Sequence, residues 1–120
     1  MLIQFCKSKL AHGRITEAQL YYEGSITIDE KLLKAAQIVP GEKVEVLNIN
    51  NGSRLETYAM AGKKGSGQIC LNGPAARLGF PGDQIIILSY GLSDPQKARS
   101  LKTRVIYLDD KNRIRRSFPF

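Results

Sequence analysis

The sequence predicts a mainly β fold, built as a small barrel with a few short helices. Short runs of β-branched residues recur along the chain, separated by turns that contain glycine or proline, of which there are 11 and 5. Signals for helices are few, and no repeat, linker or low-complexity segment interrupts the pattern. Many short strands joined by such turns are typical of small barrels, and 120 residues fit a single domain over residues 1–120.

The first expected elements are a strand and a helix. Ser25–Asp29 is a short extended run, and Asp29 is a typical N-cap residue for a helix that follows it. Apolar residues at helical spacing extend the expected helix through residues 32–36. Pro40 and Gly41 should end it and turn the chain.

A β-hairpin is expected next. Lys43–Asn48 alternates between apolar and polar residues, as a half-buried strand does. Asn51 and Gly52 form the strongest short hairpin signal in the sequence, and residues 54–61 provide the return strand.

The second half of the chain continues with short strands. Residues 68–71 form a strand that ends at Asn72 and Gly73, and Pro74 can begin one helical turn over residues 74–78. Residues 84–89 contain so many consecutive β-branched side chains that this strand should be central and buried on both faces. The last expected elements are a short helix at 95–101 and strands at 104–108 and 113–118, with a turn at 110–112.

Composition limits the classes of function. The formal charge is +7 and the pI about 9.6, and much of the excess lies in residues 97–116. A basic segment can attract nucleic acid or a small dicarboxylate, but this one has no series of interleaved aromatic residues and no helix-turn-helix pattern. We therefore favour a solvated basic face. No apolar run is long enough to span a membrane, and the polar N-terminus does not resemble a signal peptide, which predicts a cytoplasmic protein.

The sulfur and imidazole groups are too few for a usual zinc site. Cys6 and Cys70 are far apart in the sequence, and His12 is the single histidine. We expect no metal and interpret both cysteines as small buried apolar residues.

Three blocks of sequence point to a function. They are YEGSITID at residues 22–29, NGSRLETY at 51–58 and NGPAA at 72–76. The pair Gly24 and Ser25 alone would indicate only a turn. Taken together and in order, with Lys9 upstream, these blocks resemble the aspartate 1-decarboxylase family over nearly the whole chain.

The resemblance implies a fold, an assembly and a reaction. The fold would be a double-psi β-barrel, and the assembly a homotetramer with active sites between neighbouring subunits. The chain would be a precursor that cuts itself between Gly24 and Ser25 into residues 1–24 and 25–120. The enzyme would then decarboxylate L-aspartate to β-alanine, a precursor of pantothenate and coenzyme A.

The chemistry explains why a serine is needed at the cut. Decarboxylation leaves a carbanion, and no ordinary side chain offers an electron sink. A pyruvoyl ketone, which forms a Schiff base with the substrate amine, does. The hydroxyl of Ser25 would attack the carbonyl of Gly24 to give an ester, and elimination and hydrolysis would leave the pyruvoyl group. Gly24 would suit this step because glycine adopts backbone angles closed to other residues and crowds the attack least.

By resemblance, further residues take named roles. Thr57 and Asn72 would assist cleavage, and Tyr58 would protonate the carbanion. Lys9 and Arg54 would bind the substrate carboxylates, with the choice between the two carboxylates left open. The remaining residues assigned to the substrate pocket are Tyr22, Thr57, Asn72, Gly73, Pro74 and Ala75.

Strand geometry raises a question about this assignment. Side chains alternate along a strand, so Arg54 and Tyr58 should share a face while Thr57 points the other way. Either the strand bulges there, or Thr57 meets a different part of the loop around Gly24 and Ser25.

The chain departs from the family pattern at two places. Many relatives have histidine where this chain has Ala11. A shift by one residue reverses the face of a strand, so His12 is given no site role. Pro74 replaces a residue that is usually small. Neither departure affects Gly24, Ser25 or Tyr58.

Three rival functions have weaker support in the sequence. A serine hydrolase is disfavoured because Ser25 lies in no Gly-x-Ser-x-Gly elbow. A basic barrel that binds nucleic acid, and a relative that has lost self-cleavage, both stay open. The sequence also leaves open whether cleavage needs a helper protein.

Overall fold

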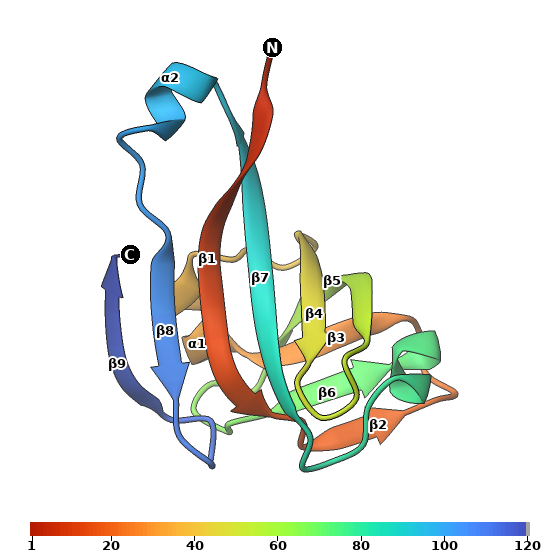
Figure 1. Cartoon of the computed structure of the whole chain (residues 1–120). Coiled ribbons are helices and arrows are strands. Elements are labelled where there is room, and N and C mark those ends of the chain that lie inside the picture. The colour runs from red at the N-terminus through yellow and green to blue at the C-terminus, as the bar shows by residue number, and fades with distance from the viewer. Residues whose placement is uncertain (120) are drawn as a thin grey trace.

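The computed structural model describes residues 1–119, and nine strands dominate it (Figure 1). The strands are β1 (Ile3–Arg14), β2 (Glu17–Gln19), β3 (Ser25–Asp29), β4 (Lys43–Asn48), β5 (Arg54–Gly62), β6 (Ile69–Asn72), β7 (Gln84–Ser93), β8 (Arg104–Leu108) and β9 (Ile114–Pro119). The helical elements are α1 (Glu30–Ala36), the 3-10 helix η1 (Gly73–Arg77) and α2 (Pro95–Ala98).

The strands close into a barrel because β1 runs directly into β2, and this one segment pairs with β7 at one end and with β6 at the other. The pairing order is β2-β6-β3-β5-β4-β7-β1-β8-β9. Thr16 lies between β1 and β2, and its backbone N–H and hydroxyl both donate to the Ile69 carbonyl of β6. The ring therefore runs through β6, β3, β5, β4, β7 and the continuous β1–β2 segment. The β3–β5 and β2–β6 pairs are parallel. The mainly β, double-psi barrel class with few short helices is confirmed.

The core lies inside this ring. Its fully buried side chains come from most barrel strands and from α1, and include Ile26, Ile28, Ile69, Ile85 and Ile87. The strand that contains the last two, β7, pairs with β1 on one side and β4 on the other. The predicted central position of residues 84–89 is therefore confirmed.

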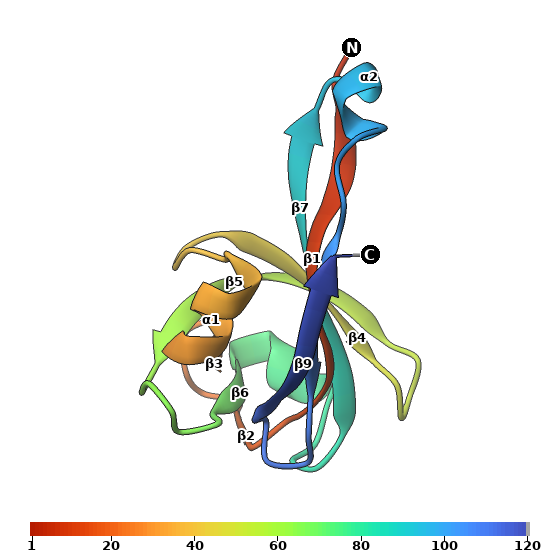
Figure 2. The ribbon, with the colours of Figure 1, turned by 90° about the vertical axis from the view of Figure 1, so that its left-hand side faces the viewer.

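Beyond the barrel, β1 and β7 continue as a long two-stranded ribbon with α2 near its tip (Figures 1 and 2). The sequence did not predict β1, and it predicted β7 only as far as residue 89. The reason lies in the register of β1, which shifts between Cys6 and Ser8 and again between Ala11 and Gly13. Two bulges break the apolar alternation by which a strand is recognised.

The hairpin of β4 and β5 matches its prediction, and small differences occur elsewhere. The helix α1 ends at Ala36 because Gln37 adopts a left-handed conformation with φ 58°, so Pro40 and Gly41 follow the end and do not cause it. The predicted helix at 95–101 is only Pro95–Ala98. Cys70 is buried as expected, whereas Cys6 is half-buried.

Asp29 ties three segments together at the end of β3. Its side chain is 2% exposed and accepts backbone N–H bonds from Lys31 at 2.8 Å, Gly65 at 2.9 Å and Gly67 at 2.8 Å. The predicted N-cap role is confirmed, and the other two bonds fix the turn between β5 and β6. Burial opposes the charge, but the three N–H bonds outweigh it and lower the pKa of Asp29.

Replacing Asp29 by asparagine should therefore destabilise the protein by about 2 kcal/mol at neutral pH, because one acceptor oxygen and the charge are lost. A carboxylate whose pKa is lowered by folding contributes fully to the free energy of unfolding at pH values above the ordinary aspartate pKa. That contribution disappears as the pH falls through the pKa of the folded state. Urea unfolding at pH 7 and at a pH below the ordinary aspartate pKa of 3.8 measures both effects. The gap between wild type and variant should shrink on acidification, and a constant gap would contradict this role.

Candidate functional site

Ser25 is the first residue of β3, in the middle of a three-stranded part of the barrel. It is 3% exposed, while Gly24 before it is exposed. On one side β3 pairs antiparallel with β6, where Ser25 is opposite Asn72 and Thr27 opposite Cys70. Because side chains alternate along strands, these four side chains share the face of the β3–β6 pair that points away from the core.

A hydrogen-bond network joins the four side chains. The Asn72 amide donates from Nδ2 to Ser25 Oγ at 3.0 Å and to Thr27 Oγ1 at 2.9 Å. The Cys70 thiol donates to Asn72 Oδ1 at 3.2 Å. Sequence reasoning predicted Ser25 and Asn72 for the site but missed Thr27 and Cys70. A signal in the sequence could have found them. Thr27 is two residues after Ser25 and Cys70 two residues before Asn72, so each shares a strand face with a predicted site residue.

Ser25 and Gly24 line two different pockets. A pocket of about 370 Å³ is lined by Gln19, Tyr22, Glu23, Ser25, Thr27, Tyr58, Met60, Ala61, Gln68, Cys70 and Asn72. A second pocket, of about 380 Å³, is lined by Gly24, Leu55, Glu56, Thr57, Tyr58, Asn72, Pro74, Ala75 and Leu78. We call them the Ser25 pocket and the Gly24 pocket. Tyr58 and Asn72 border both.

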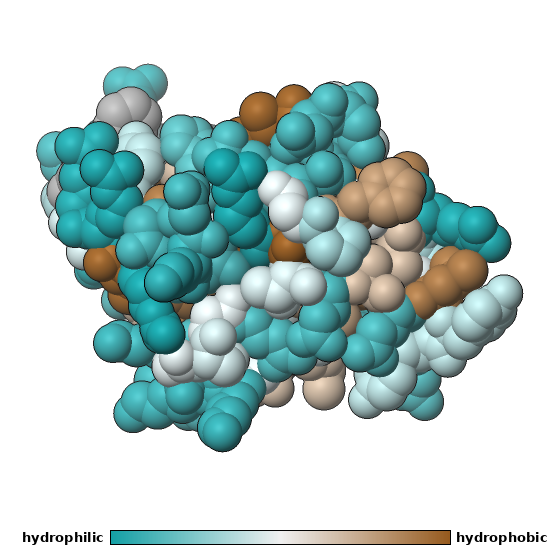
Figure 3. Space-filling model, turned by 90° about the horizontal axis from the view of Figure 1, so that it is seen from below, coloured by the Kyte–Doolittle hydropathy of each residue, from teal (hydrophilic) through white to brown (hydrophobic). Residues whose placement is uncertain are grey.

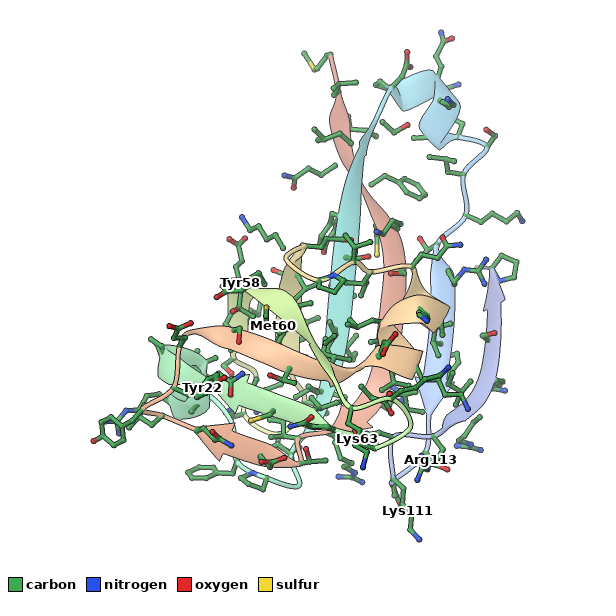
Figure 4. All side chains as sticks on the ribbon, turned by 180° about the vertical axis from the view of Figure 1, so that it is seen from behind. Tyr22, Tyr58, Met60, Lys63, Lys111 and Arg113 are labelled. Carbon is green, nitrogen blue, oxygen red and sulfur yellow. The ribbon has the colours of Figure 1, made fainter. Side chains whose placement is uncertain are left out.

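The strand β5 places Thr57 and Tyr58 on opposite faces without a bulge. Its register with β4 has no shift, and its parallel register with β3 pairs Ile26 with Ala59. Continued backwards, this register brings Tyr58 beside Ser25 and Thr57 beside Gly24. Thr57 therefore meets a different part of the loop from Tyr58, in the Gly24 pocket. Figure 4 shows Tyr58 and Met60 on the side of the barrel that carries β3 and β6, with Tyr22 at the adjoining loop.

Glycine is required at position 73 more than at position 24. Gly73 has φ +69°, and a Cβ there would lie 2.9 Å from Gly24 Cα and 2.9 Å from the Tyr22 carbonyl oxygen. Gly24 itself has no left-handed φ, and its nearest obstacle to a Cβ is Pro74 Cδ at 3.7 Å. At Gly24 the chain uses no left-handed conformation, and the suitability of glycine for the attack stays a prediction. The close approach is provided by Gly73, which allows η1 to pack against the cut site.

The two predicted cations lie elsewhere in the single chain. Arg54 is at the start of β5, and its Nη2 is 3.8 Å from Glu45 Oε1. Lys9 is half-buried on β1, opposite Leu88 of β7 and Val105 of β8. Neither residue lines the Ser25 pocket or the Gly24 pocket.

The electrostatic character of the Ser25 pocket follows from its lining. It contains the carboxylate of Glu23 but no lysine or arginine. Burial raises the pKa of Cys70, and the Glu17 carboxylate raises it further, so its thiol stays protonated at neutral pH. Within residues 1–119, no cluster of three or more histidine, cysteine, aspartate or glutamate side chains could hold a metal ion.

One group of basic residues lies away from this site. Lys63, Lys111 and Arg113 lie together at the lower end of the molecule (Figure 4), where the Arg113 guanidinium donates to the Gly65 carbonyl. Seen from below, hydrophilic residues cover most of the surface, and hydrophobic ones gather mainly toward the side of β2 and η1 (Figure 3). His12, which was given no site role, packs its ring edge-on against Tyr107. No helix among residues 1–119 could span a membrane.

Comparison with known proteins identifies related sequences. A family model described as aspartate decarboxylase matches residues 1–115. An aspartate 1-decarboxylase of Salinibacter ruber is 53% identical over 95% of this chain and 78% of its own length. Proteins of the same description from Acetivibrio thermocellus and Moorella thermoacetica are 54% and 57% identical, over 95% and 90% of this chain and 90% and 84% of their own lengths.

Proposed function

Since this chain belongs to the aspartate decarboxylase family, we propose that it converts L-aspartate to β-alanine and CO2 after cutting itself between Gly24 and Ser25. The observation that carries the proposal is the placement of Ser25. Its hydroxyl is buried in a hydrogen-bond network, and Ser25 and the preceding Gly24 each line a pocket. Such a position suits a serine that reacts with its own backbone.

Self-cleavage would begin with attack of Ser25 Oγ on the carbonyl carbon of Gly24. The C–N bond breaks, the proton of the hydroxyl moves to the released amine of Ser25, and an ester links the two residues. Loss of the Ser25 Cα proton then breaks the Cβ–Oγ bond and leaves Gly24 with a free carboxylate. Water replaces the nitrogen, which departs as ammonia, and the former Ser25 becomes a pyruvoyl group.

Thr57 and Asn72 support this step from different sides. Attack on the carbonyl places negative charge on the Gly24 oxygen, and a donor aimed at that oxygen lowers the barrier. Thr57 and Gly24 both line the Gly24 pocket, and the Thr57 hydroxyl can donate a hydrogen bond. Asn72 already donates to Ser25 Oγ, so it can hold that oxygen in place during attack.

Tyr58 is the proposed proton donor in decarboxylation. When present, the pyruvoyl group supplies the electron sink for the carbanion. The Tyr58 phenol lines the same pocket as Ser25 and remains 41% exposed, so a substrate could reach it. A positioned phenol can deliver a proton to carbon as a general acid. Tyr22, also in this pocket, would close its outer side.

The site would be completed by a second copy of the chain. Aspartate has two negatively charged carboxylates, yet the Ser25 pocket has no lysine or arginine to bind them. Lys9 and Arg54 lie on the outer face of β1 and β5, which is the face that carries Tyr58. Docking that face against the Ser25 pocket of another copy would bring cations to the substrate, as a homotetramer with active sites between subunits requires.

Mixed assemblies should reveal such shared sites. Chains with Ser25→Ala and chains with Arg54→Ala should each be inactive alone. Co-expressed, they should regain part of the wild-type β-alanine formation, because some sites then combine an intact Ser25 from one copy with an intact Arg54 from another. No recovery in a stable mixed assembly would place both residues of each site in one chain.

The overall function is tested by incubating the matured protein with L-aspartate. β-Alanine and CO2 should form in equal amounts, and L-glutamate serves as the competitor for specificity. Retention on DNA that falls steeply with salt, without any β-alanine, would favour the rival basic barrel. A cytoplasmic location stays a prediction.

A further inference from the structure

We propose that Cys70 is a positioning residue for self-cleavage, because its thiol fixes which end of the Asn72 amide faces Ser25. The proposal rests on the self-cleavage proposed above and deepens it. Cys70 does not touch the reacting atoms. It acts through Asn72, which separates it from Ser25 in the network.

The local fold leaves the two ends of the Asn72 amide with different neighbours. Cys70 and Asn72 lie two residues apart on the same face of β6 and are each 2% exposed. The Sγ–H of Cys70 donates to Oδ1 at 3.2 Å, while Nδ2 donates to Ser25 Oγ and Thr27 Oγ1. The amide therefore has its oxygen toward the thiol and its nitrogen toward the two hydroxyls.

The two hydroxyls alone could not select this orientation. A hydroxyl both donates and accepts, so Ser25 and Thr27 could bond either end of the amide with nearly the same geometry. A thiol is a weak donor and a still poorer acceptor for an N–H, so Cys70 favours an oxygen opposite it. Burial keeps this thiol protonated at neutral pH, which keeps it a donor. Among the partners of the Asn72 amide, Cys70 is thus the one that distinguishes its oxygen end from its nitrogen end.

The selected orientation matters for both steps of cleavage. With Nδ2 toward Ser25 Oγ, the serine proton is directed elsewhere and the oxygen is held for attack on Gly24. In the elimination, the Cβ–Oγ bond breaks and its electrons pass to Oγ, now part of the Gly24 carboxylate. An N–H donor stabilises that charge, whereas the carbonyl oxygen of a reversed amide would repel it.

Two substitutions separate the hydrogen bond from packing. Cys70→Ala and Cys70→Val both remove the donor for Asn72 Oδ1, but only valine fills about the space of the thiol. Self-cleavage of freshly purified precursor, followed by denaturing mass spectrometry, should slow about 10-fold with alanine, the effect of one hydrogen bond. With valine it should slow to a similar extent, because the hydrogen bond and not the filled space fixes the amide. Cys6→Ala is the control, since its thiol lies outside both pockets, and should leave the rate unchanged.

Slowing by alanine together with a wild-type rate for valine would reduce Cys70 to a packing role and overturn the proposal. Thermal unfolding of each variant shows whether slowing merely follows a loss of stability. Failure of the proposed function gives a different result, because the wild-type chain itself would then stay intact. In that case hydrogen exchange of the Asn72 side-chain amide still decides the orientation claim. Protection should be lost with alanine and with valine, and equal protection in all variants would refute it.

Discussion

Replacing Ser25 by alanine should leave an intact chain that forms no β-alanine, the largest effect expected of any single substitution. The hydroxyl is the nucleophile of self-cleavage and the source of the electron sink, so nothing in the chain can substitute for it. The barrel should persist, because alanine fits the same place in β3 and only one hydrogen bond, from Asn72, is lost. Denaturing mass spectrometry and a β-alanine assay measure the two losses.

A matched control for this substitution is Ser89→Ala. Ser89 is likewise buried, and its Oγ lies 2.6 Å from Ser8 Oγ, so the change removes a comparable hydroxyl contact far from the cut site. Cleavage should proceed normally in that variant. A Ser25→Ala chain that still separates after residue 24, or that makes β-alanine while intact, would remove Ser25 from the mechanism.

Replacing Tyr58 by phenylalanine should leave self-cleavage intact and slow decarboxylation by about 10²–10⁴-fold, the usual contribution of a general acid. The ring keeps its place between the two pockets, and only the phenol proton is lost. The kcat for β-alanine formation, measured on fully cleaved protein, isolates this effect. KM should change little if Tyr58 protonates the carbanion without binding the substrate.

Tyr90→Phe provides the comparison for Tyr58. Tyr90 is 39% exposed, close to the 41% of Tyr58, and its hydroxyl donates to Glu45 on the outer face of the sheet. It lines neither site pocket. Similar kcat values for the two phenylalanine variants would deny Tyr58 the role of proton donor.

The fold was predictable where a short stretch of sequence specifies a single local structure. Asn51 and Gly52 indicate the hairpin between β4 and β5, and Asp29 caps α1 because its side chain satisfies a helix N–H. The strand β1 was missed because its two bulges, at Lys7 and at His12, break the alternation, and the pairing partners that stabilise them are distant in sequence. Barrel closure through Thr16 and Ile69 has no local signature either.

Resemblance to the family predicted some residues of the site, and sequence reasoning missed the others. The blocks around Ser25, Tyr58 and Asn72 named residues that the structure gathers around two pockets. The roles of Cys70 and Gly73 depend on register between β3 and β6 and on a contact with Gly24. Neither the register nor the contact is encoded within one segment, so only the folded chain reveals them.

The central claim, that the chain makes its own cofactor from Ser25, is tested most directly by denaturing mass spectrometry of the purified protein after a warm incubation. Two fragments should appear, one of residues 1–24 and one of residues 25–120 whose mass fits an N-terminal pyruvoyl group in place of serine. A chain that remains intact near 13.3 kDa would contradict unaided self-cleavage, and two fragments with an unmodified N-terminal serine would contradict formation of the cofactor.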